Sequence, residues 1–278
     1  HMSWRLKVRH SSGFRYSAPV RASYNEARIT PLTTPQQSTI QAELLVEPRA
    51  STYLYWDYWG TLVHAFELHD AHEELTVIGT ATVETGTAPP FAGDASWAEV
   101  TGAADRFAEL LTPSAHIPVD EEVASWAADA AAASPAETLH PVVDLVRDRL
   151  AYVPGATGVS TSAVEAFHQR QGVCQDFAHL AIGALRSLGV PARYVSGYLH
   201  PDLDAAIGDT VVGQSHAWVE AWFGEWVPID PTNGSTPEDH HVVVARGRDY
   251  ADVSPLRGIF SGGRAERLAV SVELTRVG

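Results

Sequence analysis

The 278-residue sequence contains a single cysteine, Cys174, so no disulfide can form within the chain. A free thiol suits a reducing compartment, and we expect a cytoplasmic protein. No stretch approaches the roughly twenty consecutive apolar residues that a membrane-spanning helix needs. The first residues also lack the apolar core of a secretion signal. We therefore expect no membrane partner.

Basic residues are scarce as well: 19 Lys and Arg oppose 34 Asp and Glu, for a formal net charge of −15. A nucleic acid or an anionic membrane surface attracts a basic face, which this composition does not readily supply. We expect no nucleic-acid partner and a neutral or cationic substrate. The 45% hydrophobic content is enough for one large or two ordinary domains, and no signal specifies an oligomeric state.

The amino-terminal part is expected to consist of strands. Apolar and polar residues alternate, with Asn, Asp and Gly at the breaks, in residues 4–10, 38–48, 61–69 and 74–85. Without any strand–helix–strand alternation, the pattern predicts an antiparallel β-sandwich. The aromatic run Tyr53–Trp59 could face a ligand, but strands favour aromatic residues, so we expect packing in the core or between domains.

Three histidines, His64, His69 and His72, could be considered as metal ligands. No cysteine accompanies them, and an alternating strand turns His64 and His69 to opposite faces. We expect no metal here and no cofactor in the protein.

A Pro-rich segment, residues 87–93, is expected to be a linker, and helices follow it. The helical ranges are 103–111, 120–133 with Asp120 at its start, and 135–150. Ser162 and Glu165 have the spacing of a capping box. We expect a β-sandwich domain at residues 1–90, a helical connection at 91–134, and a catalytic core with a carboxy-terminal β tail at 135–278.

Cys174 lies where a loop enters a helix. From Cys174 to Leu188 apolar residues recur every three or four positions, and Gly189 and Pro191 end the pattern. A cysteine in a first helical turn lies near unpaired backbone N–H groups, which favour its thiolate and make it a usable nucleophile. The alternative is a small buried hydrophobic residue.

Two later segments supply partners for the sulfur. Residues 215–222 alternate like a strand and contain His216, and residues 226–234 form a second short strand that ends in a turn with Asp230 and Asn233. Cysteine catalysis needs a histidine to exchange the thiol proton and an Asp or Asn to orient its ring. The order Cys, His, Asp fits that requirement.

These segments resemble a known family. Residues 172–179 (GVCQDFAH), 215–218 (SHAW) and 230–234 (DPTNG) are similar to the three signature segments of the bacterial transglutaminase-like cysteine protease family. The amino-terminal part resembles the family's β domain at Asp57–Gly60, His64 and residues 72–75, which implies a structural role for His72. The resemblance implies an α+β, papain-like/transglutaminase core in which the Cys174 helix packs on an antiparallel sheet carrying His216 and Asp230.

In this reading Cys174 attacks a carboxamide or peptide carbonyl, His216 moves the proton and Asp230 orients His216. The Cys174 backbone N–H is the expected oxyanion donor. Papain-like enzymes usually add a side-chain donor just before the cysteine, and both Gln169 and Gln171 lie there.

Other residues near the motifs have weaker assignments. The family's core has a loop upstream of the cysteine, so Tyr152 is a candidate for the acyl pocket, although a packed tyrosine is the simpler expectation. Trp218 shares a strand face with His216 and either shields the site or belongs to the core. We expect Glu220 to be a solvated edge group, and Asp176 and His179 to support the site from behind or to pack.

The acyl acceptor is not specified. Water gives hydrolysis and a lysine or small amine gives cross-linking. We rank amide or peptide hydrolysis first and transfer to an amine acceptor second, both on a peptide or protein substrate. A non-catalytic protein-binding module is a distant third, because no member of the Cys, His, Asp set is lost.

The hairpin register tests the assignment of Asp230. A two-residue loop at Gly224-Glu225 would place Asp230 opposite Val219, on the wrong face. A three-residue loop at residues 223–225 pairs Trp222 with Trp226 and places Asp230 opposite Trp218, diagonal to His216. We therefore predict the three-residue loop and an Asp230–His216 hydrogen bond. Asn233 is the next candidate if Asp230 faces away.

Overall fold

The computed structural model describes residues 3–86, 93–213 and 215–278. Its strands are β1 (Trp4–Ala27), β2 (Gln37–Glu47), β3 (Thr52–Trp56), β4 (Leu62–Leu68), β5 (His72–Thr85), β6 (Ala151–Tyr152), β7 (Gln171–Gly172), β8 (Ala192–Leu199), β9 (Thr210–Gly213), β10 (His216–Trp222), β11 (Trp226–Ile229), β12 (His241–Gly247), β13 (Leu256–Ser261), β14 (Ala265–Arg267) and β15 (Ser271–Arg276). Its helices are α1 (Trp97–Gly102), α2 (Glu121–Ala127), α3 (Leu139–Arg149), α4 (Ala163–Gln169), α5 (Cys174–Ser187) and α6 (Tyr250–Val253), with 3-10 turns at Ala108–Leu110, Ala128–Ala130 and Ala136–Thr138.

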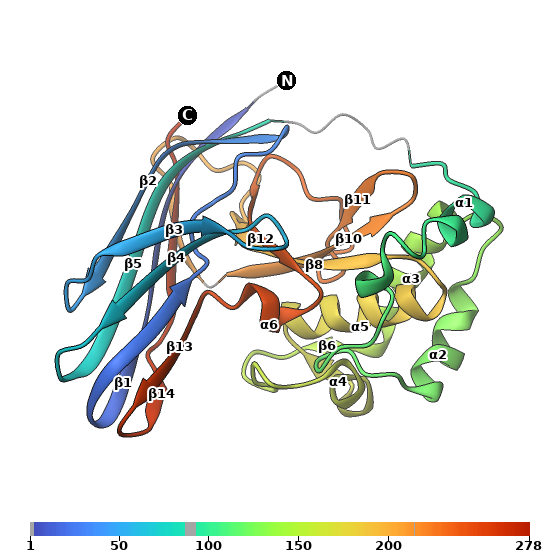
Figure 1. Cartoon of the computed structure of the whole chain (residues 1–278). Helices are drawn as coiled ribbons and strands as arrows, with labels where there is room; N and C mark the ends of the chain where they lie inside the picture. The colour runs from blue at the N-terminus through green and yellow to red at the C-terminus, as the bar shows by residue number, and fades with distance from the viewer. Residues whose placement is uncertain (1–2, 87–92, 214) are drawn as a thin grey trace.

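The large sheet is built around β1. The first part of this long strand pairs with β5, β14 and β15, and its second part pairs with β4 and β13. The two parts carry sheet halves that face each other across a cluster containing Phe14, Val46 and Leu75 from one half and Phe66 and Leu256 from the other. The expected β-sandwich is therefore one sheet folded on itself, as Figure 1 shows on the blue side of the molecule.

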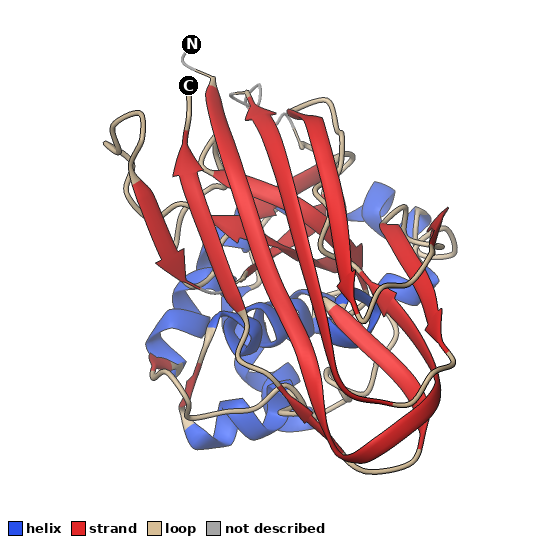
Figure 2. Ribbon diagram, turned by 90° about the vertical axis from the view of Figure 1, so that its left-hand side faces the viewer, coloured by secondary structure: helices blue, strands red, loops and turns tan. Residues whose placement is uncertain are grey.

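Strands from the end of the chain complete this sheet. β13, β14 and β15 all pair with β1, and β9 pairs with β15. The two termini consequently lie side by side at one end of the long strands (Figure 2). The limits expected at residues 90 and 135 remain a prediction, and the proposed linker falls mostly outside the described residues. The strands β9, β13, β14 and β15 nevertheless belong to the amino-terminal sheet.

The α+β core has helix α5 packed on a second, four-stranded sheet in the order β11-β10-β8-β12. Helices α2, α3 and α4 contact the other sides of α5, so nearly every residue from Gln175 to Arg186 is buried (Figure 1). The apolar stripe predicted on this helix is confirmed. A helix enclosed on all sides gives Cys174, its first residue, a fixed position.

The core and the folded sheet share apolar packing. Trp4, Leu6 and Val83 of the large sheet belong to the same buried cluster as the residues of α5. The Tyr198 hydroxyl, on β8, donates to the Ile29 carbonyl (2.8 Å) and accepts from His10 Nδ1 (2.9 Å). The two parts therefore meet through an apolar contact that also contains hydrogen bonds from Tyr198.

The helices before α5 are shorter than predicted. The range 103–111 is not one helix. The Ser96/Glu99 capping box starts α1 before this range, and α1 ends at Gly102. Within the range only a 3-10 turn forms. Asp120 caps α2 as expected, with its carboxylate accepting from the Val123 N–H (2.8 Å), but the helix stops at Ala127. Tertiary packing overrides the helix propensity of the alanine run beyond it. The Ser162/Glu165 capping box on α4 is confirmed.

The aromatic run at residues 53–59 was expected to pack inside, and for most of it this is wrong. Tyr53 and Leu54 of β3, then Trp56 and Tyr58, are between 53% and 79% exposed. Among the described strands β3 pairs with β4 alone, so it lies at an edge of the sheet, and most of its side chains are exposed.

Among the described residues, no helix is long and apolar enough to cross a membrane.

Candidate functional site

The loop before α5 is held by the helix itself. The Asp176 carboxylate, in the first turn, accepts from the Val173 N–H (2.8 Å) and from the Thr157 hydroxyl (2.5 Å). A Cβ on Gly172 would lie 2.6 Å from the Asp176 Cβ, so glycine is needed for this close approach. Asp176 therefore supports the loop from behind, as predicted. The Cys174 N–H lies in the first turn, where no intrahelical acceptor exists.

The hairpin register is the predicted one. Trp222 pairs with Trp226 and Val219 with Ile229, so Phe223, Gly224 and Glu225 form a three-residue loop. Gly224 adopts a φ of +96°, which glycine tolerates without strain. Asp230 follows β11 directly and lies diagonal to His216. Its Oδ2 is 2.7 Å from His216 Nε2, which confirms the predicted hydrogen bond.

Asp230 is buried and surrounded by donors. Its Oδ1 accepts from the backbone N–H groups of Thr232 (3.0 Å) and Asn233 (3.2 Å), and its Oδ2 accepts from Asn233 Nδ2 (2.8 Å). His241 Nε2 lies 3.4 Å from the same oxygen. Burial favours the neutral acid, but the hydrogen bonds from His216, His241 and Asn233 lower the pKa of Asp230 far below its ordinary value. The group is a carboxylate, and Asn233 supports it instead of replacing it.

His216 is held as an imidazolium. Burial alone would lower its pKa, but the hydrogen bonds and charges of Asp230 and Cys174 raise the pKa to about 10. Because Nε2 faces Asp230, Nδ1 is the ring nitrogen left for the Cys174 sulfur. The structure thus brings together the three residues that the sequence singled out, with the ring between carboxylate and sulfur.

Trp218 packs behind this arrangement. Its ring is fully buried, with its centroid 6.1 Å from that of His216 and 5.2 Å from that of His241. A Cβ on Gly197, across the sheet, would clash with the Val242 carbonyl and with the Trp218 ring, so Gly197 makes room for it. The expectation that Trp218 is a core residue is confirmed, and the expectation that it shields the imidazole from water stays a prediction.

A pocket of about 230 Å³ opens at Cys174 and His216. Its other lining residues are Tyr152, Val173, Leu199, Pro201, Val211, Val212, Gly213, Ser215 and Leu274. Tyr152 reaches it because β6 pairs in parallel with β7, which places Tyr152 beside Gly172. Gln169 ends α4 and Gln171 lies in β7, and neither lines this pocket. Of the side-chain candidates Tyr152, Gln169 and Gln171, Tyr152 is therefore the one that lines the pocket at the sulfur.

Glu220 was expected to be a solvated edge group, and this is wrong. It is buried and paired with Arg193 and Arg246, whose guanidinium nitrogens lie 2.5 to 3.2 Å from its carboxylate oxygens. Arg193 also stacks on the Trp226 ring (4.0 Å). Strand parity placed Glu220 on the His216 face, but it could not show that the amino-terminal sheet covers this face.

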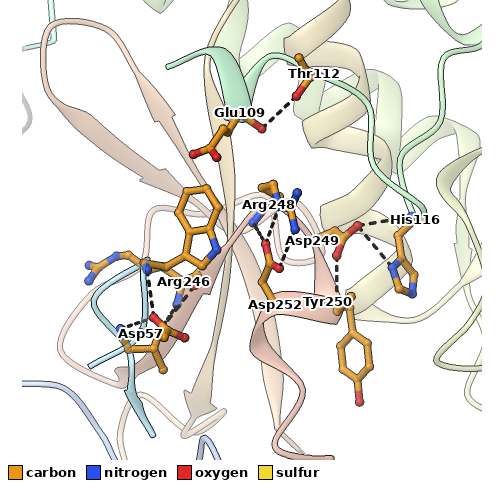
Figure 3. A network of polar contacts seen from close by, with 12 residues as sticks. Asp57, Glu109, Thr112, His116, Arg246, Arg248, Asp249, Tyr250 and Asp252 are labelled. Atoms are coloured by element: carbon orange, nitrogen blue, oxygen red, sulfur yellow. Dashed lines mark hydrogen bonds and ion pairs between the residues drawn. The ribbon is translucent and has the colours of Figure 1, made fainter. Parts of the chain in front are cut away.

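His179 packs behind the cysteine, as predicted. It is fully buried, burial lowers its pKa to about 3, and its Nε2 accepts from the Tyr250 N–H (3.1 Å). Next to it the Asp249 carboxylate accepts from the His116 backbone N–H (3.3 Å) and caps α6 at Ala251 (2.8 Å). Figure 3 shows Asp249 between His116 and Tyr250. This network ties the segment after β12 to the helices that enclose α5.

The histidines considered as metal ligands do not converge. His64 hydrogen-bonds the Thr30 hydroxyl (2.9 Å), exposed His69 pairs with Glu67 (3.1 Å), and His72 bonds the Asp70 carbonyl (2.8 Å). Among the described residues, the clusters with metal-ligand spacing are His216, Asp230 and His241, and Glu238, Asp239 and His240. In the first cluster the imidazole nitrogens face Asp230 as hydrogen-bond donors, so a cation would have to displace their protons.

Neither His241 nor the far wall of the pocket could be predicted from the sequence. His241 begins β12 and reaches Asp230 only because β12 lies beside β8 in the sheet. Val211 and Leu274 come from strands of the amino-terminal sheet. Only an expectation of which strands are neighbours could have found them.

Comparisons with known proteins agree with this arrangement. Residues 124–231 match the transglutaminase-like superfamily, and residues 6–84 match the bacterial transglutaminase-like N-terminal region. An uncharacterized protein of Mycobacterium leprae is 46% identical over 277 residues, 99% of each chain. A protein-glutamine gamma-glutamyltransferase of Pseudomonas aeruginosa is 39% identical over 115 residues, 37% of this chain and 17% of that protein. The crystal structure of a candidate cysteine protease from Cytophaga hutchinsonii superposes with a TM-score of 0.77 at 23% identity, covering 100% of this chain and 92% of that one, and so shows the same fold.

Proposed function

Because the chain belongs to the transglutaminase-like superfamily, whose members typically use a cysteine for acyl chemistry, we propose that Cys174, His216 and Asp230 form a catalytic triad that hydrolyses peptide or carboxamide bonds. The observation that carries the proposal is the position of the His216 ring. Its Nε2 is 2.7 Å from Asp230 Oδ2, and the ring lines the same pocket as Cys174, which helps to raise the pKa of His216. No other histidine among the described residues combines contact with the cysteine and contact with a carboxylate in this way.

The proposed reaction begins with attack of the Cys174 thiolate on the substrate carbonyl carbon. The carbonyl oxygen becomes an oxyanion, which accepts a hydrogen bond from the Cys174 N–H at the start of α5. As the tetrahedral intermediate collapses, the C–N bond breaks and the His216 imidazolium gives its proton to the leaving nitrogen. A thioester and an amine, or ammonia, result.

Resolution of the thioester reverses these roles. Neutral His216 takes a proton from water as the oxygen attacks the thioester carbonyl, and the C–S bond then breaks to release a carboxylic acid and the thiolate. Asp230 keeps the ring oriented and stabilises the imidazolium when it reforms. Buried Trp218 limits access of solvent to the ring from behind.

Transfer of the acyl group to an amine is the second candidate. The likeness of the core to a protein-glutamine gamma-glutamyltransferase favours it. In that reaction a lysine or small amine replaces water at the thioester, and the triad acts in the same way. The chain itself contains a single lysine, exposed Lys7 on β1, so it can modify itself at one lysine side chain at most.

An electrophilic thiol probe tests the triad. We expect intact-mass analysis to show one adduct on Cys174, slower labelling in His216→Ala and none in Cys174→Ala. Both variants should lose turnover by at least about a thousandfold and keep the wild-type melting temperature. Turnover retained in Cys174→Ala would disprove the assignment. A screen of glutamine peptides, scored for ammonia release and for incorporation of a labelled amine, separates hydrolysis from transfer.

A non-catalytic binding module would show ligand binding without either reaction.

We further propose that the protein acts in the cytoplasm, where its one thiol stays reduced. Fractionation of the cells of origin, with detection of the protein outside the cytoplasmic membrane, would contradict this location.

A further inference from the structure

β9 is an edge strand in the wall of the catalytic pocket. It pairs with β15 and with no other described strand. Three of its residues, Val211, Val212 and Gly213, line the pocket that holds Cys174 and His216. A free strand edge, with its row of backbone donors and acceptors, therefore lies next to the proposed nucleophile.

The register of β9 shows which backbone groups are free. The Arg276 N–H donates to the Asp209 carbonyl (3.0 Å), so these two residues form a hydrogen-bonded pair. Such pairs alternate along an antiparallel ladder. Val211 and Gly213 consequently bond to β15, whereas Thr210 and Val212 turn their N–H and C=O groups to the open edge. The Thr210 and Thr275 hydroxyls lie 2.7 Å apart, as the closer side chains of a non-hydrogen-bonded pair allow.

This edge carries neither charge nor proline, two of the usual protections against pairing. The sequence Thr-Val-Val-Gly of β9 contains no charge and no proline, and Val212 is 70% exposed. At the opposite edge of the same sheet, β2 carries Glu43 and Glu47 and a register irregularity after Thr39. Charges and bulges of that kind hinder the pairing of an edge strand with another strand, whereas an uncharged, apolar open edge favours it.

We propose that the substrate is an extended polypeptide segment that adds to the free edge of β9, so that its backbone pairs with Thr210 and Val212 while its reacting carbonyl lies at Cys174. The proposal rests on the acyl chemistry proposed above and adds the class of substrate to it. Recognition through the backbone tolerates many sequences. The pocket walls at Leu199, Val211 and Leu274 accept one apolar or amide side chain, and a folded or strictly small-molecule amide would leave the edge unused.

Val212→Pro is the sharpest variant, because it removes the outward N–H and adds no charge. Proline is tolerated on an edge strand whose N–H faces solvent. Val212→Ala is the matched control, since it keeps the N–H and removes most of the side chain. With unfolded casein as substrate, we expect the KM of Val212→Pro to exceed that of Val212→Ala roughly fivefold to tenfold, as loss of one hydrogen bond does. The rate of Cys174 alkylation by iodoacetamide should be the same in the two variants.

A binding experiment separates this proposal from the catalytic one. In Cys174→Ala, casein should slow amide hydrogen exchange at residues 210–213. Protection without turnover by the wild type would support the docking edge and contradict the hydrolase. Turnover that Val212→Pro leaves unchanged, with no protection, would overturn the docking edge and leave the hydrolase intact. Absence of both would overturn both proposals.

A second copy of the chain is the competing occupant of β9. It would protect residues 210–213 without casein, in proportion to protein concentration, and Val212→Pro would convert a dimer to a monomer in sedimentation. That result would overturn the substrate proposal.

Discussion

At the scale of single residues, Asp230 sets the pH range of the site. The pKa of His216 is raised to about 10, so the imidazolium persists above neutrality and is lost only as pH rises through that value. Asp230→Asn removes the negative charge that stabilises the imidazolium, so the pKa of His216 should fall toward its ordinary value of about 6.5. We expect a reduced but measurable kcat/KM whose alkaline limb lies up to about three pH units lower.

The control for this measurement is Asn233→Ala. Asn233 donates to the Asp230 carboxylate at 2.8 Å, and its loss leaves the charge in place. The alkaline limb of the kcat/KM profile of Asn233→Ala should therefore move much less than that of Asp230→Asn. An unchanged limb in the pH profile of Asp230→Asn would remove Asp230 from the triad.

At the scale of elements, the β10–β11 loop determines whether Asp230 faces His216. Replacing Gly224-Glu225 by Asn-Gly should favour a two-residue turn in which Phe223 pairs with Trp226, which shifts the register by one and places Asp230 opposite Val219, on the other face. We expect a loss of kcat/KM close to that of Asp230→Ala. Wild-type turnover with the shorter loop, measured on the same peptide, would show that the register does not matter.

The same hairpin shows what a sequence can predict. The face and register of Asp230 follow from strand parity and loop length, which are local quantities. The apolar stripe of α5 and the caps at Asp120 and Ser162 are local too, and the structure contains them. The Cys174 and His216 contact needed the family resemblance, because no local rule joins a helix to a strand some forty residues later.

What the sequence missed depends on which elements are neighbours. Glu220 seemed exposed because the arginines that pair with it, Arg193 and Arg246, come from two other strands. His241 contacts Asp230 across the sheet, and the pocket wall at Val211 and Leu274 belongs to the amino-terminal sheet. The aromatic run at residues 53–59 was predicted to be buried and is mostly exposed, because strand propensity does not predict which side chains other elements cover.

At the scale of the whole molecule, buried neutral histidines make the fold sensitive to acid. Burial lowers the pKa values of His10, His179 and His241 to about 4, 3 and 4. Below the unfolded value of about 6.5 the unfolded chain binds protons that the folded chain does not, so the free energy of unfolding falls as pH falls. Three such groups give a slope of about 4 kcal/mol per pH unit. We expect cooperative unfolding between about pH 6 and pH 4.

Urea denaturation at a series of pH values measures this slope. His10→Gln should reduce the slope by about one proton, and His69→Gln, at a side chain that is 65% exposed, is the control that keeps all three buried histidines. A flat midpoint from pH 6.5 to pH 4.5 would contradict the prediction.

The expected division near Pro89-Pro90 can be tested by limited proteolysis. Cleavage there should yield two fragments that still elute together in size-exclusion chromatography, because β9, β13, β14 and β15 lie in the amino-terminal sheet and the apolar cluster is shared. Separation of the fragments without denaturant would mean that the domains are independent after all.

The pairing of β1 with β15 also has a consequence for the order of events during synthesis. β1 and β5 can pair early in translation, but β15 leaves the ribosome long after them, and β9 has no neighbour until β15 arrives. Contacts between residues so distant in sequence form late, because they close the largest loop. The nascent chain therefore makes its thiol, its histidine and its carboxylate before it can complete the pocket wall, and full activity should appear only after β15 has been synthesised.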